Sequence, residues 1–112
     1  MRKDDTIRLR HMIDAAEEAI SFTSGRKRED LDSDRMLALS LVKEIEIVGE
    51  AASKVSEACR ARYPEIPWPS IITMRHRLIH GYFDINLDVV WATVTDELAP
   101  PVTSLKKALA ID

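Results

Sequence analysis

Two side chains in the segment 68–85 have the types and the spacing to do chemistry together. Arg75 and His80 lie five residues apart, and the stretch 70–82 around them holds two arginines, two histidines and no acidic residue. An imidazole can accept or donate a proton near neutral pH. A guanidinium stays charged and can hold two phosphate oxygens at once. The pair is therefore a candidate site for moving a proton beside a bound phosphate.

The spacing of this pair constrains how one chain could use it. On a regular helix, residues five apart are separated by about 140° and about 7.5 Å, so Arg75 and His80 would diverge. Two copies related by a two-fold axis could bring two of each group into one cleft. The alternatives are structural: His80 could be only a cation at a helix end, and Arg75 only a partner in a surface ion pair.

A metal site is a weaker interpretation of the same segment. His76 and His80 are four apart, a spacing that can place two ligands on one helix face. Two ligands are too few, and Cys59 and His11 would have to come near by chance. We expect no metal and no other cofactor.

Composition bounds the kind of protein that must position these groups. The chain has 112 residues, 46% of them apolar and 31% charged, which predicts a single globular domain spanning 1–112. The net charge of −3 argues against binding duplex DNA through bulk charge. No stretch is long and apolar enough to cross a membrane, and no charged-then-apolar leader opens the chain. With the single cysteine Cys59, these features favour a reduced, cytoplasmic location.

Apolar residues recur at three- and four-residue spacings along most of the chain, and alternating strand patterns are absent. This periodicity predicts an all-α fold, an up-and-down bundle of four main helices plus a short C-terminal helix. The expected helices are 5–23, 34–63, 69–80 and 86–98, followed by a short one that reaches Ala110.

Polar residues before each apolar run predict where the helices begin. Asp4, Asp5 or Thr6 could cap the first helix, and Asp32 or Ser33 the second. Asn86 is the expected cap of the fourth.

Glycine and proline predict the ends and the contacts. Gly25 can take a left-handed conformation after the first helix, and Gly81 can cap the helix that ends at His80. Gly49 lies inside the second helix, where it costs about 1 kcal/mol relative to alanine, so we expect it to permit a close helix approach. Pro100 and Pro101 must break or kink the fourth helix.

The segment 68–85 resembles the HEPN superfamily, and more narrowly its HepT branch, whose pattern reads Arg-x4-His-x-Tyr. Arg75, His80 and Tyr82 match that pattern residue by residue. Two further motifs agree in order, Ile-Val-Gly-Glu-Ala at 47–51 and Pro-Glu-Ile-Pro-Trp at 64–68. The resemblance therefore covers nearly the whole chain.

One residue departs from the family pattern. Many members carry asparagine directly after the arginine, and this chain carries His76. A neutral imidazole can donate and accept hydrogen bonds at once, as an amide does. His76 is therefore a supporting residue whose effect on substrate or rate is open.

The resemblance implies a function for the whole chain. It implies a metal-independent RNA endonuclease that acts as a homodimer, with Arg75 and His80 as catalytic residues. It also implies that the chain is the toxin of a toxin–antitoxin pair whose antitoxin is an MNT-type nucleotidyltransferase. That partner would transfer AMP to Tyr82, and the added negative charge would repel RNA phosphates from the site.

Two other classes remain open. A helical module of this kind could bind a nucleotidyltransferase or a nucleotide without cutting RNA, or it could be a purely structural dimer. Tyr82 could then only pack its ring and bond through its hydroxyl.

Overall fold

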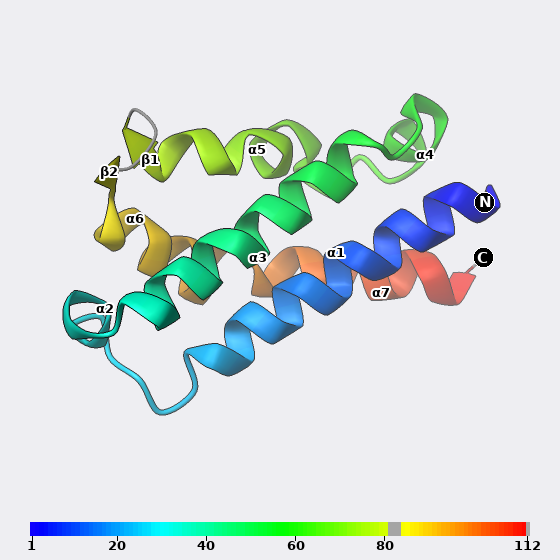
Figure 1. The fold of residues 1–112 in the computed structure, drawn as a ribbon. Helices are drawn as coiled ribbons and strands as arrows, with labels where there is room; N and C mark the ends of the chain where they lie inside the picture. Colours follow the sequence, from blue (N-terminus) through cyan, green and yellow to red (C-terminus); the bar gives the residue numbers. More distant parts are fainter. Residues whose placement is uncertain (81–83, 112) are drawn as a thin grey trace.

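Two long helices form one layer of the molecule. The computed structural model describes residues 1–80 and 84–111, and in it α1 (Lys3–Phe22) and α3 (Arg35–Ser53) run antiparallel side by side (Figure 1). The short helix α2 (Asp30–Ser33) lies in the connection between them. Each long helix turns one apolar stripe inward, because its buried residues recur at helical spacing.

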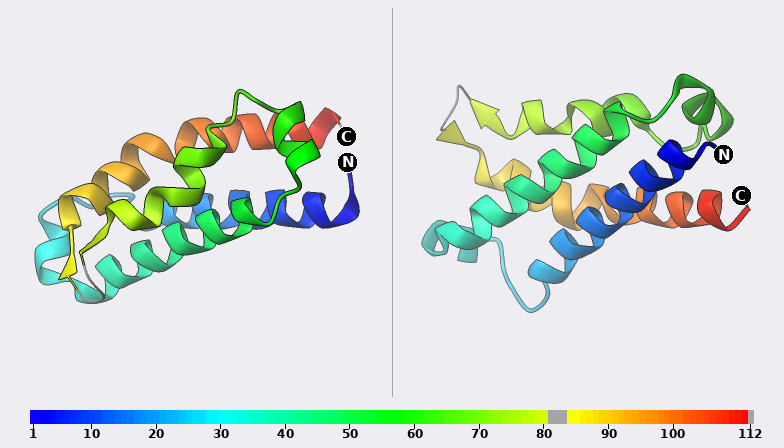
Figure 2. Two further views of the ribbon diagram at one scale, coloured as in Figure 1. Left: turned by 90° about the horizontal axis from the view of Figure 1, so that it is seen from above. Right: turned by 45° about the vertical axis from the view of Figure 1, so that its right-hand side comes forward.

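The remaining helices cover the inner side of this pair. α5 (Trp68–Thr73) and the 3₁₀ turn Met74–Arg77 pack on α3, while α7 (Ala99–Ile111) packs on α1. α6 (Leu87–Ala92), a π-helical turn (Thr93–Glu97) and α7 follow one another as a bent rod, as both views in Figure 2 show. The expected all-α bundle is confirmed. No helix within residues 1–80 and 84–111 is both long and apolar enough to cross a membrane.

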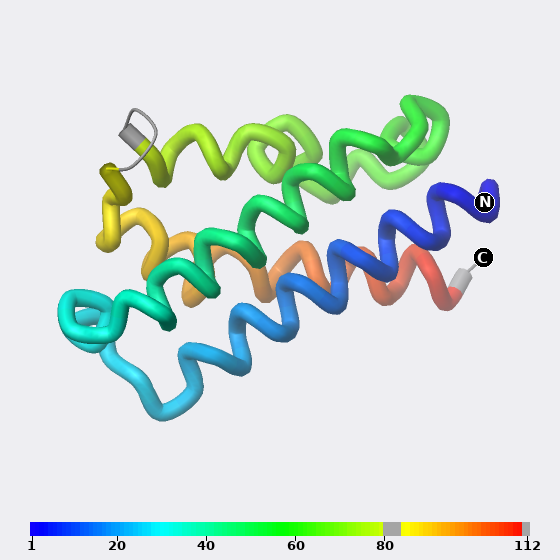
Figure 3. Tube along the Cα trace, in the orientation of Figure 1, coloured from blue at the N-terminus to red at the C-terminus, as the bar shows by residue number. Residues whose placement is uncertain are grey.

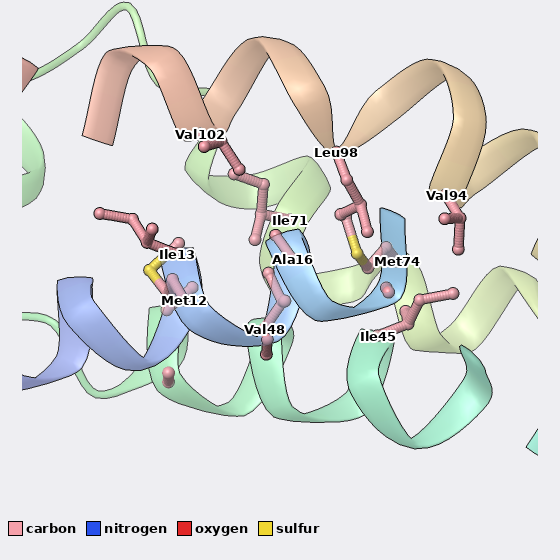
Figure 4. Close-up of a cluster of buried hydrophobic side chains, with 14 of the residues drawn as sticks. Met12, Ile13, Ala16, Ile45, Val48, Ile71, Met74, Val94, Leu98 and Val102 are labelled. Carbon is pink, nitrogen blue, oxygen red and sulfur yellow. The ribbon is translucent and has the colours of Figure 1, made fainter. Parts of the chain in front are cut away.

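The core lies where the two layers meet. Figure 4 shows side chains from α1, α3, α5 and the bent rod converging there, including Met12, Ile45, Ile71, Met74 and Leu98. All five are essentially inaccessible to solvent. Truncating one such residue to alanine typically costs about 2–5 kcal/mol. The core therefore fixes α3 against α5 and the 3₁₀ turn that follows it.

The end of the first helix agrees with expectation, but its start does not. α1 begins at Lys3, and Arg2 before it makes no side-chain cap hydrogen bond, so the expected caps Asp4, Asp5 and Thr6 all lie inside the helix. α1 ends at Phe22, and Gly25 has a φ of 73°, the left-handed conformation that glycine adopts without strain. The cap of α3 is different from the expected Asp32 or Ser33, because α2 occupies those positions. Asp34 is the cap, and its Oδ1 accepts a hydrogen bond from the Leu37 amide at 3.0 Å.

The expected helix 34–63 is two helices. α3 ends at Ser53, and α4 (Glu57–Arg62) begins after a turn visible in Figure 3. Ser56 caps α4, since its Oγ accepts from the Cys59 amide at 3.2 Å. Asp5 is not a cap of α1: it is buried and accepts from the amide and the hydroxyl of Ser56, at 2.8 and 2.6 Å.

The expected helix 69–80 is also wrong at its end. The helical path stops after the 3₁₀ turn, and Ile79–His80 forms a two-residue strand (β1) that pairs antiparallel with Asp84–Ile85 (β2). The Asn86 amide also donates to the Leu78 carbonyl at 2.7 Å. These hydrogen bonds between the two strands replace the ones that a helix would have made, so His80 does not lie at a helix end. Gly81, the expected cap, lies outside the described residues.

The start of the expected helix 86–98 is confirmed, but its end is wrong: α6 ends at Ala92, and the π-helical turn follows. Asn86 caps α6 through its Oδ1, which accepts from the Val89 amide at 3.2 Å. Pro100 and Pro101 lie in the first turn of α7, where their missing amide hydrogens leave no helical bond unmade. The prolines therefore mark the beginning of a new helix of 13 residues.

Candidate active site

Arg75 projects from the 3₁₀ turn toward α3. The turn is anchored by Met74 and Leu78, which are 1% and 0% exposed, and Arg75 between them faces outward. Its Nε donates a hydrogen bond to Oε1 of Glu46 at 3.0 Å, and the two side chains are 54% and 30% exposed. The guanidinium is thus held at one edge and open to solvent at the other.

This contact leaves the two terminal nitrogens of Arg75 available. Neither has a hydrogen-bond partner within the described part of the chain. Two parallel N–H groups are the geometry that binds two phosphate oxygens together. Glu46 meanwhile offsets part of the positive charge and limits the rotation of the side chain. The arrangement can present a fixed cationic fork to a phosphate.

Glu46 was missed by sequence reasoning, although a signal for it existed. It lies three positions before Gly49, hence on nearly the same face of α3. A Cβ placed on Gly49 would stand 3.2 Å from the Ile71 carbonyl oxygen and 3.4 Å from that of Ile72. The expected close approach at Gly49 is therefore confirmed, and it brings α5 and the following turn down onto the Glu46 face.

His76 lies on the same turn but points elsewhere. Successive residues of a 3₁₀ helix are about 120° apart, so Arg75, His76 and Arg77 face three directions. Arg77 donates through its Nη1 to Oε1 of Glu97 in the π-helical turn, at 3.0 Å. His76 is exposed and forms no hydrogen bond with any described residue.

The other two motif residues are only partly within the described structure. The backbone of His80 pairs with Asp84 in the β1–β2 ladder. The side chain of His80 and the whole of Tyr82 lie outside the described residues. Because the chain leaves the helix before His80, the helical separation expected for Arg75 and His80 does not apply, nor does the shared helix face expected for His76 and His80.

No three His, Cys, Asp or Glu side chains of residues 1–80 and 84–111 come together in a way that could hold a metal ion.

Comparison with known proteins gives a consistent set of relatives. Residues 12–109 match the family described as Ribonuclease HepT-like. The chain is 32% identical over 101 residues to the "Putative RNase TTE0752" of Caldanaerobacter subterraneus subsp. tengcongensis, covering 90% of each chain. It is 31% identical over 98 residues to the "Probable ribonuclease HepT" of Thermococcus cleftensis, covering 88% of this chain and 89% of that one. No solved structure matched the chain.

Proposed function

Because the chain belongs to the HepT-like ribonuclease family, we propose that it is a metal-independent RNA endonuclease and the toxin of a HEPN/MNT toxin–antitoxin pair. The observation that carries the proposal is the exposed Arg75, fixed at its Nε by Glu46 with both terminal nitrogens available. When no metal supplies positive charge, a cationic side chain that binds phosphate oxygens can stabilise the charge that develops on the phosphorane.

In the proposed reaction the 2′-hydroxyl of the RNA attacks the adjacent phosphorus. A general base takes the hydroxyl proton, the bond to the 5′-oxygen breaks, and a general acid protonates that oxygen. The products are a 2′,3′-cyclic phosphate and a 5′-hydroxyl, so no water or cofactor is consumed. His80 exchanges the protons, Arg75 stabilises the charge on the phosphorane, and His76 supports the site.

One chain supplies one motif histidine, whereas the reaction uses a base and an acid. We propose that two chains related by a two-fold axis share one cleft and supply both. Mixing His80→Ala chains with Arg75→Ala chains tests the sharing, because only a composite cleft would bring the remaining Arg75 and the remaining His80 together. With a single histidine the mixed dimer should regain part of the activity that neither variant has alone.

Control of the toxin would come from AMP transferred by the nucleotidyltransferase antitoxin to Tyr82. The phenol oxygen attacks the α-phosphorus of ATP, pyrophosphate leaves, and the phenol proton goes to solvent or a base. The attached phosphate is negative and competes with RNA phosphate for Arg75. Since both RNA and ATP are cytoplasmic, the proposal places the pair there.

The deciding experiment is cleavage of RNA by the purified chain in the presence of a chelator. Wild type should cut RNA, whereas His80→Ala and Arg75→Ala should lose activity while keeping the wild-type circular dichroism and melting temperature. Arg75→Lys should also fail substantially, because a point charge cannot replace the fork. Full activity in folded His80→Ala would remove the catalytic assignment.

The same assay addresses the modification and the rival class. Tyr82→Phe should still cut RNA but gain no AMP mass with the antitoxin and ATP. AMP found on another residue would contradict the assignment of Tyr82. A wild-type chain that binds the nucleotidyltransferase but cuts no RNA would instead be a non-catalytic helical module.

A further inference from the structure

An open groove of about 460 Å³ lies between α1 and α3 on the face where Arg75 projects. Arg8 and His11, one helical turn apart, come from α1. Lys43 comes from α3, one turn before Glu46. Arg75 itself lines the same groove. The candidate phosphate ligand is therefore one member of a larger surface, which we call the α1–α3 groove.

The groove is basic although the chain is acidic. Its lining holds four Lys or Arg side chains and two carboxylates, Glu46 and Glu50, whereas the whole chain has a net charge of −3. Both carboxylates already face a cation: Glu46 accepts from Arg75 at 3.0 Å, and Glu50 lies 3.6 Å from Lys54. The charge of the remaining cations is thus not cancelled by the groove's own acids.

Arg8 and Lys43 are those remaining cations. Within residues 1–80 and 84–111, neither side chain forms an ion pair or a hydrogen bond, and the same holds for the exposed His11. The floor beside them includes the half-buried Ile47. Two walls that present unpaired donors over a partly apolar floor suit a single strand of nucleic acid, whose backbone is anionic and whose bases are flat and apolar on their faces.

We propose that the α1–α3 groove binds backbone phosphates of single-stranded RNA next to the phosphate held by Arg75, with Arg8 and Lys43 as the main contacts and His11 as an additional donor. The proposal rests on the ribonuclease function proposed above and extends it to the substrate. RNA is favoured over an acidic protein surface because the free nitrogens of Arg75 belong to the same site.

Binding can be measured apart from cleavage. A labelled single-stranded RNA with 2′-O-methyl groups has no free 2′-hydroxyl, so it can be titrated against the wild-type dimer at several salt concentrations without being cut. The test variant is Arg8→Ala/Lys43→Ala. The matched control is Arg10→Ala/Lys107→Ala, which removes the same charge from exposed positions outside the groove.

The groove variant should bind RNA roughly tenfold more weakly at moderate salt. The slope of log K against log salt concentration should become shallower by about 1.4, since each phosphate contact of a single strand contributes about 0.7 to that slope. The control should keep the wild-type slope. Arg8→Lys/Lys43→Arg should also keep it, because the charge is preserved. On unmodified RNA, the groove variant should raise KM and leave kcat near wild type.

Wild-type affinity and slope in Arg8→Ala/Lys43→Ala, or an equal loss in the control, would overturn the proposal. Displacement of the RNA by stoichiometric ATP would also overturn it, because it would indicate a nucleotide site. So would a groove variant that loses binding to the purified nucleotidyltransferase but still binds RNA. If the wild type shows the expected groove binding but never cuts unmodified RNA, the ribonuclease assignment fails and the groove stands. If it cuts RNA while the groove variant binds normally, only the groove proposal fails.

Discussion

The Nε of Arg75 lies 3.0 Å from Oε1 of Glu46, so a carboxylate of α3 orients a side chain that belongs to the 3₁₀ turn after α5. Under the proposed function, removing this carboxylate should misplace the guanidinium. A small misplacement of a catalytic group can cost up to about 10²-fold in rate. We expect Glu46→Ala to lower kcat/KM by about 10-fold or more, and Glu46→Gln, which keeps an acceptor oxygen, by less.

Glu50→Ala is the matched control for that measurement. It removes the same charge from the same groove but leaves the contact with Arg75 intact. Equal kinetic effects of Glu46→Ala and Glu50→Ala would show that only the charge of the groove matters, and not the orientation of Arg75.

Gly49 sets the distance between α3 and α5. Because a Cβ there would already stand 3.2 Å from a backbone oxygen, a branched side chain must push the two helices apart. We expect Gly49→Val to lower the free energy of unfolding by about 1–3 kcal/mol, the usual cost of overpacking. Urea denaturation measures this, with Ser53→Val at an exposed position of the same helix as the control. Unchanged stability in Gly49→Val would mean that α5 can shift without cost.

The carboxyl of Glu44 makes stability depend on pH. Glu44 is 6% exposed, and its Oε2 is buried without a hydrogen-bond partner among the described residues. Burial raises the pKa of Glu44 to about 7, and the neighbouring carboxyl of Glu18 adds to the shift. The folded chain therefore holds a proton that the unfolded chain has already released, so the free energy of unfolding should fall as pH rises from about 4.5 to above 7.

Glu44→Gln imitates the protonated carboxyl at every pH. It should remove this part of the pH dependence and exceed the wild-type free energy of unfolding above pH 7 by roughly 1–3 kcal/mol. Denaturation at pH 5 and pH 8 provides the comparison, and Glu65→Gln on the surface should leave the profile unchanged. A destabilised Glu44→Gln at pH 8 would contradict the assignment.

Asp5 should have the opposite effect on how the free energy of unfolding changes with pH. Burial raises the pKa of this carboxyl, but the hydrogen bonds from the Ser56 hydroxyl and amide outweigh it and the net shift is downward. The stabilisation is therefore present above the ordinary aspartate pKa and is lost as pH falls. Asp5→Asn should lower the free energy of unfolding by about 1–3 kcal/mol at pH 7, and the difference from wild type should shrink toward pH 3. A difference that grows on acidification would contradict this account.

Local signals located the end of α1, the turn at Gly25 and the start of α6, since capping and glycine conformation act over a few residues. The break after Ser53 could not be found in this way. Val55 and Cys59 are buried and continue the apolar spacing of α3, so the periodicity runs through the break. The start of α4 is fixed by two hydrogen bonds that Ser56 donates to Asp5, 51 positions earlier.

The candidate site likewise combines a residue that the sequence identified with contacts that it could not predict. The sequence motif identified Arg75 but placed it inside an expected helix 69–80, and its partner Glu46 lies 29 positions away and carries no motif of its own. The strand pair at Ile79–His80 is two residues long, too short for an alternating pattern to register. Contacts between distant segments decided both features, and periodicity within one segment does not report them.

The π-helical turn at Thr93–Glu97 keeps the bent rod in phase with the core. Val90, Val94, Leu98 and Val102 are spaced four apart and all are buried. On a regular α-helix of 3.6 residues per turn, each four-residue step would drift by about 40° around the axis, and the last of these residues would leave the core. The wider turn absorbs that drift. The turn therefore holds about one residue more than a regular helix of the same phase would need, since one residue of an α-helix turns about 100°. Deleting one residue between 93 and 97 should leave α7 in phase with the core, whereas deleting one from the regular helix of α6 or α7 would rotate the residues beyond it by about 100°.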